Sequence, residues 1–138
     1  MNADFFDAHE RHNQDADLLF NSQRWANADH LYGMAAECGL KRIMQAFGMP
    51  LNLTTSSPAQ RNDWVHADGA WTRFEIYRSG HHQGAGYVLP TPSPFDDWHV
   101  SQRYANRSNF AAVRAQAHQV GANLVMGLIK KAQLEGLI

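Results

Sequence analysis

The sequence predicts an all-α fold, a four-to-five-helix antiparallel bundle in a single domain that spans residues 1–138. Three observations lead to this prediction. Residues 22–47 contain no proline and repeat apolar residues every three or four positions, which is the period of an α-helix. Residues 108–134 show the same period. Between them, residues 79–94 are so rich in glycine and proline that they predict a long surface loop before the last helix.

The first helix is predicted to begin at Asn2 or Asp4, either of which can cap it, and to end near Asn21. Ser22 is then the expected cap of a helix over residues 22–47, and the two helices would form an antiparallel hairpin. Gly48 and Pro50 would end this second helix.

Residues 22–47 are expected to form the central helix of the bundle because they carry apolar and small residues on more than one face. These residues form two rows: Ala28, Leu31, Ala35 and Cys38, and Tyr32, Ala36, Gly39, Ile43 and Phe47. A helix of this kind needs neighbours on most of its sides. His30, Glu37 and Lys41 interrupt the apolar surface, and they predict either a polar latch or dimer contact, or the lining of a cleft between helices.

A third helix is predicted to start at Ser56 or Ser57, ahead of Pro58, and to bury an apolar face. That face would comprise Trp64, Ala67, Trp71, Phe74 and Tyr77. Residues 95–104 predict one helical turn or an extended piece. A final helix is predicted from Asn106 or Ser108 to about Leu134, with its buried face formed by Phe110, Val113, Ala117, Val120, Leu124 and Leu128.

Composition limits the classes of function. The 12 Lys and Arg residues against 13 Asp and Glu residues give a formal charge of −1, so the chain as a whole does not attract phosphate backbones. The single cysteine, Cys38, cannot form an internal disulfide. The charged N-terminus predicts no signal peptide, and no apolar run approaches the length of a membrane span. A soluble, cytoplasmic protein without a cofactor is expected.

Residues 28–44, ADHLYGMAAECGLKRIM, resemble the central helix of the HEPN superfamily, the higher eukaryote and prokaryote nucleotide-binding helical bundles. The matching elements are Ala28, Leu31, Tyr32, Gly33, Ala35, Ala36, Glu37, Cys38 and Lys41. A second similarity lies in residues 96–106, DDWHVSQRYAN, which precede the last helix. The resemblance implies a bundle that forms a homodimer and is associated with RNA cleavage, with toxin–antitoxin pairs or with a nucleotidyltransferase partner.

Catalytic HEPN members typically carry an arginine, four to six further residues and a histidine near the start of the final helix. This chain departs from that pattern. Arg103 and Arg107 have no histidine at that spacing, and Arg114 is separated from His118 by three residues. The resemblance therefore implies a module without the full catalytic motif.

Arg103, Tyr104 and Arg107 are the candidate ligand-binding residues, because guanidinium groups beside a helix start can hold a phosphate. The alternative is that these arginines are solvated or paired with acids such as Asp96 and Asp97. Arg114 and His118, which share one side of the final helix, are the candidate catalytic pair. A histidine on the surface of a helix is the alternative for His118.

Eight histidines raise the question of a metal, but none is predicted. His9 and His12 are one residue short of the HExxH spacing, and His81 and His82 lie in the expected loop. The sequence leaves three hypotheses. The first is a dimeric HEPN-like module that binds a partner protein, RNA or a nucleotide. The second is a divergent, metal-independent ribonuclease that uses arginine and His118 across a dimer interface. The third is a protein that binds a small molecule in a bundle cleft.

Overall fold

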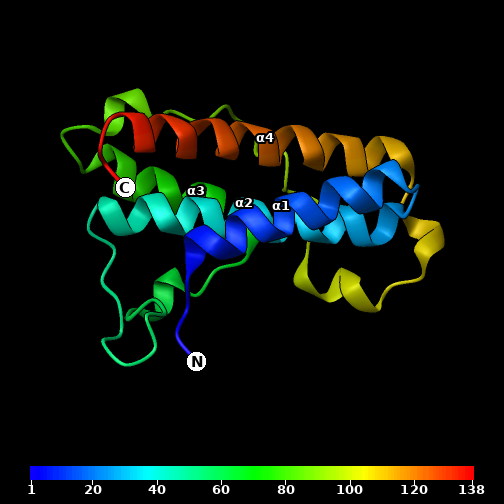
Figure 1. Ribbon diagram of the computed structural model, residues 1–138, viewed down its shortest axis with the longest axis horizontal. Coiled ribbons are helices and arrows are strands. Elements are labelled where there is room, and N and C mark those ends of the chain that lie inside the picture. The colour runs from blue at the N-terminus through cyan, green and yellow to red at the C-terminus, as the bar shows by residue number, and fades with distance from the viewer.

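The computed structural model describes all 138 residues and contains four α-helices (Figure 1). They are α1 (Phe5–Asn21), α2 (Trp25–Ala46), α3 (Ala67–Ser79) and α4 (Ala112–Leu134). Four short 3₁₀-helices lie in the connections: η1 (Arg61–Asp63), η2 (Gly84–Gly86), η3 (Val100–Tyr104) and η4 (Arg107–Asn109). The predicted all-α bundle is confirmed, and its only β feature is an isolated bridge between Leu51 and Pro58.

Helix α2 is the centre of the bundle, as its two apolar rows predict. It contacts α1, α3 and α4, and most of its residues are buried. Two glycines make the close packing possible. A Cβ atom on Gly33 would lie 2.2 Å from the indole of Trp98, and one on Gly39 would lie 2.5 Å from Val125. Large side chains from the rest of the chain therefore press directly against the α2 backbone.

Helix α1 begins as predicted, because the Asp4 carboxylate accepts hydrogen bonds from the backbone N–H groups of Phe6 and Asp7. The prediction that Ser22 caps α2 is wrong. Ser22 instead ends α1, and its N–H and hydroxyl both donate to the Leu18 carbonyl. The chain then turns through Gln23, which has a positive φ of 60°, and α2 begins at Trp25 without a side-chain cap.

Helix α3 begins at Ala67, about ten residues later than predicted from Ser56, Ser57 and Pro58. The intervening segment is held as a loop by its own hydrogen bonds. The Asn52 carboxamide accepts from the N–H groups of Thr54 and Thr55, and Pro58 pairs with Leu51 across the β-bridge. These contacts prevent a helix from starting at Ser57, and they leave Trp64 outside α3 and largely exposed.

Helix α4 differs from the prediction in its start and in its buried face. Asn106 caps η4 instead of α4, which begins at Ala112. The predicted face is wrong for most of the helix, because Val113, Val120 and Leu124 are exposed. Of the other predicted residues, Phe110 is buried ahead of the helix and Leu128 packs against the core. The buried residues are Ala115, His118, Gly121, Ala122, Val125, Ile129 and Ala132. Most of them are small, which lets α4 lie close to α2.

Helices α1 and α2 are antiparallel, whereas α4 runs in the same direction as α2 (Figure 1). Asp29, near the start of α2, contacts His118 in the first half of α4, and Gly39, further along α2, faces Val125. The long connection of residues 80–111 makes this direction possible because it carries the chain back along the bundle. On its way it places Tyr87, Leu89, Phe95 and Trp98 in the core.

His9 joins α1 to α2 inside the bundle. Its Nδ1 lies 2.8 Å from the Ala35 carbonyl oxygen and therefore donates, which leaves Nε2 to accept from the Asn13 carboxamide at 3.3 Å. Both ring nitrogens are thus satisfied by a neutral imidazole. Burial lowers the pKa of His9, and it also lowers the pKa values of His12 and His30.

The packing predicts that Gly33→Ala destabilises the protein by roughly 1–3 kcal/mol, because Trp98 must move to admit a methyl group. Alanine is otherwise the better helix former by about 1 kcal/mol. Gly127→Ala on α4 is the matched control, since nothing lies within 4 Å of a Cβ atom there, and it should not destabilise. Urea unfolding measures both changes. A Gly33→Ala variant more stable than the wild type would contradict the packing.

The lowered histidine pKa values predict that the protein loses stability as the pH falls below about 6.5. In that range the unfolded chain binds protons that the folded chain does not, so the free energy of unfolding decreases with acidification. Urea unfolding between pH 7.5 and pH 5 measures the slope. His9→Gln should make the slope shallower, whereas His82→Gln, at an exposed loop position, should not. A wild-type stability that is constant across this range would refute the assignment.

Candidate functional site

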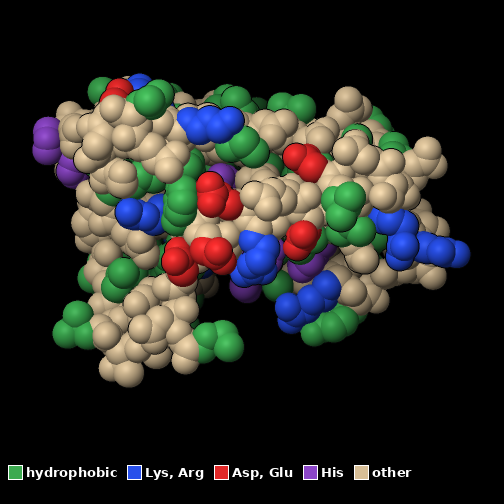
Figure 2. All heavy atoms as spheres, in the orientation of Figure 1, with side chains coloured by type: hydrophobic (Ala, Val, Ile, Leu, Met, Phe, Trp, Pro, Cys, Tyr) green, Lys and Arg blue, Asp and Glu red, His purple; other side chains and the backbone are tan.

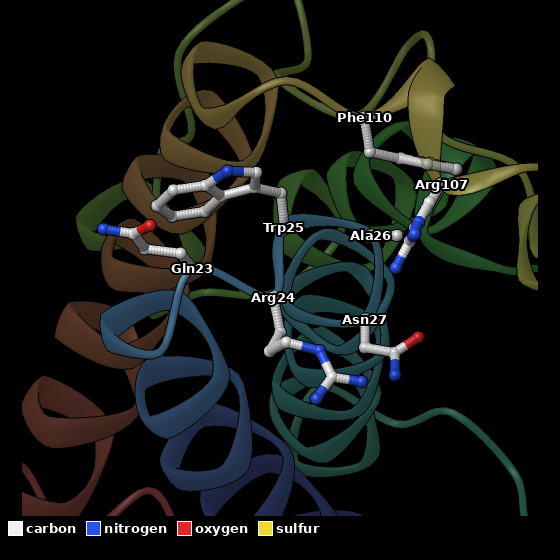
Figure 3. A pocket seen from close by; sticks show the side chains of 7 residues that line it. All are labelled: Gln23, Arg24, Trp25, Ala26, Asn27, Arg107 and Phe110. Carbon is white, nitrogen blue, oxygen red and sulfur yellow. The ribbon is translucent and has the colours of Figure 1, made fainter.

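A pocket of about 210 Å³ lies at the end of the bundle where α1 turns into α2 (Figure 3). It is lined by Gln23, Arg24, Trp25, Ala26, Asn27, Arg107 and Phe110. Figure 3 shows the side chains of Arg24, Asn27 and Arg107 on one side of the first turn of α2, with Gln23 and Trp25 on the other. The pocket thus combines two arginines from segments far apart in the sequence.

The pocket has the electrostatics of an anion site. Helix α2 starts here with no side-chain cap and no acidic residue in its first turn, so the positive end of its dipole is not neutralised. Neither Arg24 nor Arg107 takes part in an ion pair, and no carboxylate lines the pocket. Two free guanidinium groups beside an uncapped helix start can hold a phosphate or a carboxylate.

The formal charge of −1 is a sum over charged residues that are unevenly distributed along the sequence. Residues 98–134 contain no Asp or Glu, and they hold five of the basic residues: Arg103, Arg107, Arg114, Lys130 and Lys131. Figure 2 shows Lys and Arg side chains gathered at the end of the molecule where α1 meets α2. Of these five residues, Arg103 and Arg107 precede α4, whereas Lys130 and Lys131 lie near its C-terminal end, so the acid-free run does not by itself locate the pocket.

The structure separates the predicted ligand-binding residues. Arg107 lies in the pocket, but Arg103 and Tyr104 belong to η3 and do not line it. The Arg103 guanidinium lies over the Tyr104 ring, 4.9 Å from its centre, and Tyr104 is 78% exposed. Neither Arg103 nor Arg107 pairs with Asp96 or Asp97. Arg24, Trp25 and Asn27 were missed, because the predicted cap at Ser22 set the start of the helix two residues too early and placed Arg24 inside it.

Arg114 and His118 are brought together by two carboxylates, one from α2 and one from the segment before α4. His118 Nδ1 lies 2.8 Å from Asp29 Oδ2, and His118 Nε2 lies 3.0 Å from Asp97 Oδ1. Arg114 contacts the same two acids, with Nε 3.3 Å from Asp29 Oδ2 and a hydrogen bond to Asp97. Gln102 completes the cluster by donating to Asp29 Oδ1.

This cluster is closed. Asp29 and His118 are buried, and the Phe95 ring stacks on the His118 imidazole with 5.1 Å between ring centres. Both ring nitrogens of His118 face a carboxylate oxygen, and the same two carboxylates contact Arg114, so Arg114, His118, Asp29 and Asp97 use one another as partners. We call these residues, with Gln102, the Asp29 latch. It ties α2 to the loop before α4 and to α4 itself.

The polar residues in the middle of α2 form a second internal connection. Lys41 Nζ lies 2.7 Å from Glu37 Oε1 and donates to the Val65 carbonyl at the same distance. Glu37 Oε2 lies 3.1 Å from His66 Nδ1, so the pair holds the chain just before α3. His30 does not join them, and its ring stacks on Trp98 with 5.2 Å between centres.

Two further findings concern the whole chain. No group of three or more His, Cys, Asp or Glu side chains is arranged to hold a metal ion. None of the helices combines the length and the apolar character that crossing a lipid bilayer requires.

Comparisons with protein-family models, with curated proteins and with solved structures found no match. The resemblance to HEPN bundles therefore stays a prediction.

The Asp29 latch predicts that His118→Ala lowers the free energy of unfolding by roughly 2–4 kcal/mol, because the buried Asp29 carboxylate loses a partner. Urea unfolding at pH 7 measures the loss. His82→Ala, at an exposed loop position, should change stability by less than about 0.5 kcal/mol. Equal stabilities of the two variants would show that the latch does not hold the fold.

Proposed function

We propose that the chain is a HEPN-like helical module that forms a homodimer and binds RNA, or a nucleotide, at its basic end, without a full catalytic motif. The observation that carries this proposal is the pocket at the start of α2, where Arg24 and Arg107 lie beside an uncapped helix and have no ion-pair partners. Phosphate is the anion that this arrangement suits best, since each guanidinium group can donate two parallel hydrogen bonds to it.

Single-stranded RNA fits the surroundings of the pocket better than a free anion does. Tyr104 is exposed beside the pocket-lining segment and is already stacked under Arg103, so it offers a face for an unpaired base. The backbone phosphates would then contact Arg107 and Arg24. A nucleotidyltransferase or an antitoxin is the protein partner that the resemblance implies, and it belongs to the same proposal.

A ribonuclease that uses Arg114 and His118 is the second candidate. The structure supports it in one respect, because these two side chains share Asp29 and Asp97. We rank it second because both nitrogens of His118 face carboxylates and the ring is buried, so no nitrogen is free to take a proton from a ribose hydroxyl.

The proposal predicts that Arg24→Gln and Arg107→Gln each weaken binding of a fluorescent single-stranded RNA by about tenfold, the loss expected for one charge-assisted phosphate contact. A plot of the logarithm of the RNA association constant against the logarithm of the salt concentration has a negative slope, and each substitution should reduce the magnitude of that slope by about 0.7. Fluorescence anisotropy at several salt concentrations measures both. Arg61→Gln is the control, an exposed arginine in η1 that does not line the pocket. Equal losses in all three variants, or no binding by the wild type, would refute the site.

The same preparations decide between the two candidates. Wild type and His118→Ala are incubated with mixed RNA, with and without a chelator. Intact RNA in all samples agrees with a binding module. Cleavage that persists in the chelator and disappears in a folded His118→Ala protein would make the ribonuclease the correct function.

A further inference from the structure

A second groove, of about 230 Å³, lies between α1 and α4 and shares no residue with the basic pocket. Both helices pack against α2, but α1 and α4 come close to each other at few points. From α1 the groove is lined by Glu10, Asn13 and Asp17, whose spacing of three and four residues places them on one side of the helix. Met126 and Ile129 of α4 give the groove an apolar wall.

Asn13 has a hydrogen-bond acceptor that the chain does not use. The residue is 3% exposed, and its Nδ2 group donates to His9 Nε2. Its Oδ1 atom is buried and accepts no hydrogen bond. A buried carboxamide oxygen without a donor costs free energy. An N–H group supplied from the groove that Asn13 lines would remove this cost.

The groove favours a cation over an anion. Neither Glu10 nor Asp17 takes part in an ion pair. Helix α1 carries four acidic residues and one basic residue, Arg11, and Figure 2 shows most of the Asp and Glu side chains on this face gathered along α1. Lys130 is the only Lys or Arg that lines the groove, and it has no ion-pair partner. The carboxylates in the lining therefore outnumber the ammonium group.

We propose that this groove binds a linear polyamine, an aliphatic chain with a protonated nitrogen at each end and another between them. Glu10 and Asp17 are seven residues apart, so their Cα atoms lie about 10.5 Å apart along α1. An extended triamine with eight atoms between its terminal nitrogens spans about 11 Å, from standard bond lengths. Its end ammonium groups would reach the two carboxylates, and its middle nitrogen would donate to Asn13 Oδ1. Its methylene groups would lie on Met126 and Ile129.

The arrangement of the three polar side chains fits a chain-like ligand better than a metal ion. Glu10, Asn13 and Asp17 follow one another over two turns of α1, whereas ligands of a metal ion must converge on one point. A diamine of the same length would leave Asn13 Oδ1 without a donor. Lys130 weakens the binding of any polyamine, since its ammonium group repels the ligand. The site does not depend on RNA binding at the other pocket.

Calorimetric titration of the full chain with spermidine, in the absence of RNA, tests the site. The matched ligand is 1,8-diaminooctane, which has the same number of chain atoms and the same terminal amines but no middle nitrogen. The wild type should bind spermidine at least about fivefold more tightly. This preference should disappear in a folded Asn13→Ala protein. A preference caused by the additional charge alone would persist in that variant.

Charge variants test the groove through exposed side chains. Glu10→Gln should weaken spermidine binding about threefold, and Lys130→Gln should strengthen it by a similar factor. Asp15→Asn is the matched control, because it removes one negative charge from α1 at an exposed position outside the groove. It should leave the affinity nearly unchanged. Circular dichroism shows whether each variant keeps the helical content of the wild type.

Three results would overturn the proposal. The first is a wild type that does not bind spermidine at about 1 mM. The second is a preference for spermidine over 1,8-diaminooctane that persists in folded Asn13→Ala. The third is an equal loss of affinity in Glu10→Gln and Asp15→Asn, which would reveal general attraction to an acidic helix. If Asn13→Ala does not fold, the comparison of Glu10→Gln and Lys130→Gln with Asp15→Asn decides the outcome.

Discussion

The burial of a single carboxylate, that of Asp29, is the constraint on which much of this architecture depends. A buried charge is costly unless it is paired, and here it is paired with Arg114 and His118 of α4 and with Gln102 of η3. These contacts fix the start of α4 relative to α2. They also hold the loop between η3 and α4 against the same end of the bundle. Arg107 lies in that loop, and the latch therefore contributes indirectly to placing it in the lining of the same pocket as Arg24.

The sequence predicted those parts of the fold that local patterns determine. The Asp4 cap and the apolar rows of α2 depend on residues a few positions apart, and both predictions hold. The predicted start of α3 was wrong because the Asn52 turn and the bridge from Leu51 to Pro58 compete with a helix at Ser57. The prediction of the buried face of α4 was wrong for a different reason. Periodicity shows that Val120 and Val125 each belong to an apolar row, but it cannot show which row meets α2.

The candidate site was predicted in part for a similar reason. Arg107 was identified because it precedes the last helix, and yet its partner comes from the turn between α1 and α2. The predicted cap at Ser22 placed Arg24 within a helix, and Arg24 was therefore not identified as a residue of the pocket. The overall charge of −1 was equally misleading, because it averages an acidic N-terminal part with residues 98–134, which contain no acid at all. Counting charges by segment shows that residues 98–134 are basic and includes Arg107, but it leaves out Arg24, which lies in the turn before α2.

Helix α4 acts on the pocket through one of its sides. Its inner side carries Arg114 and His118, which hold the Asp29 carboxylate. Val120 and Leu124, on its outer side, are 55% and 41% exposed and take no part in the latch. A change to the latch therefore acts on the pocket, because it frees the loop that holds Arg107. The latch is thus a positioning element for the proposed binding, although no ligand needs to touch it.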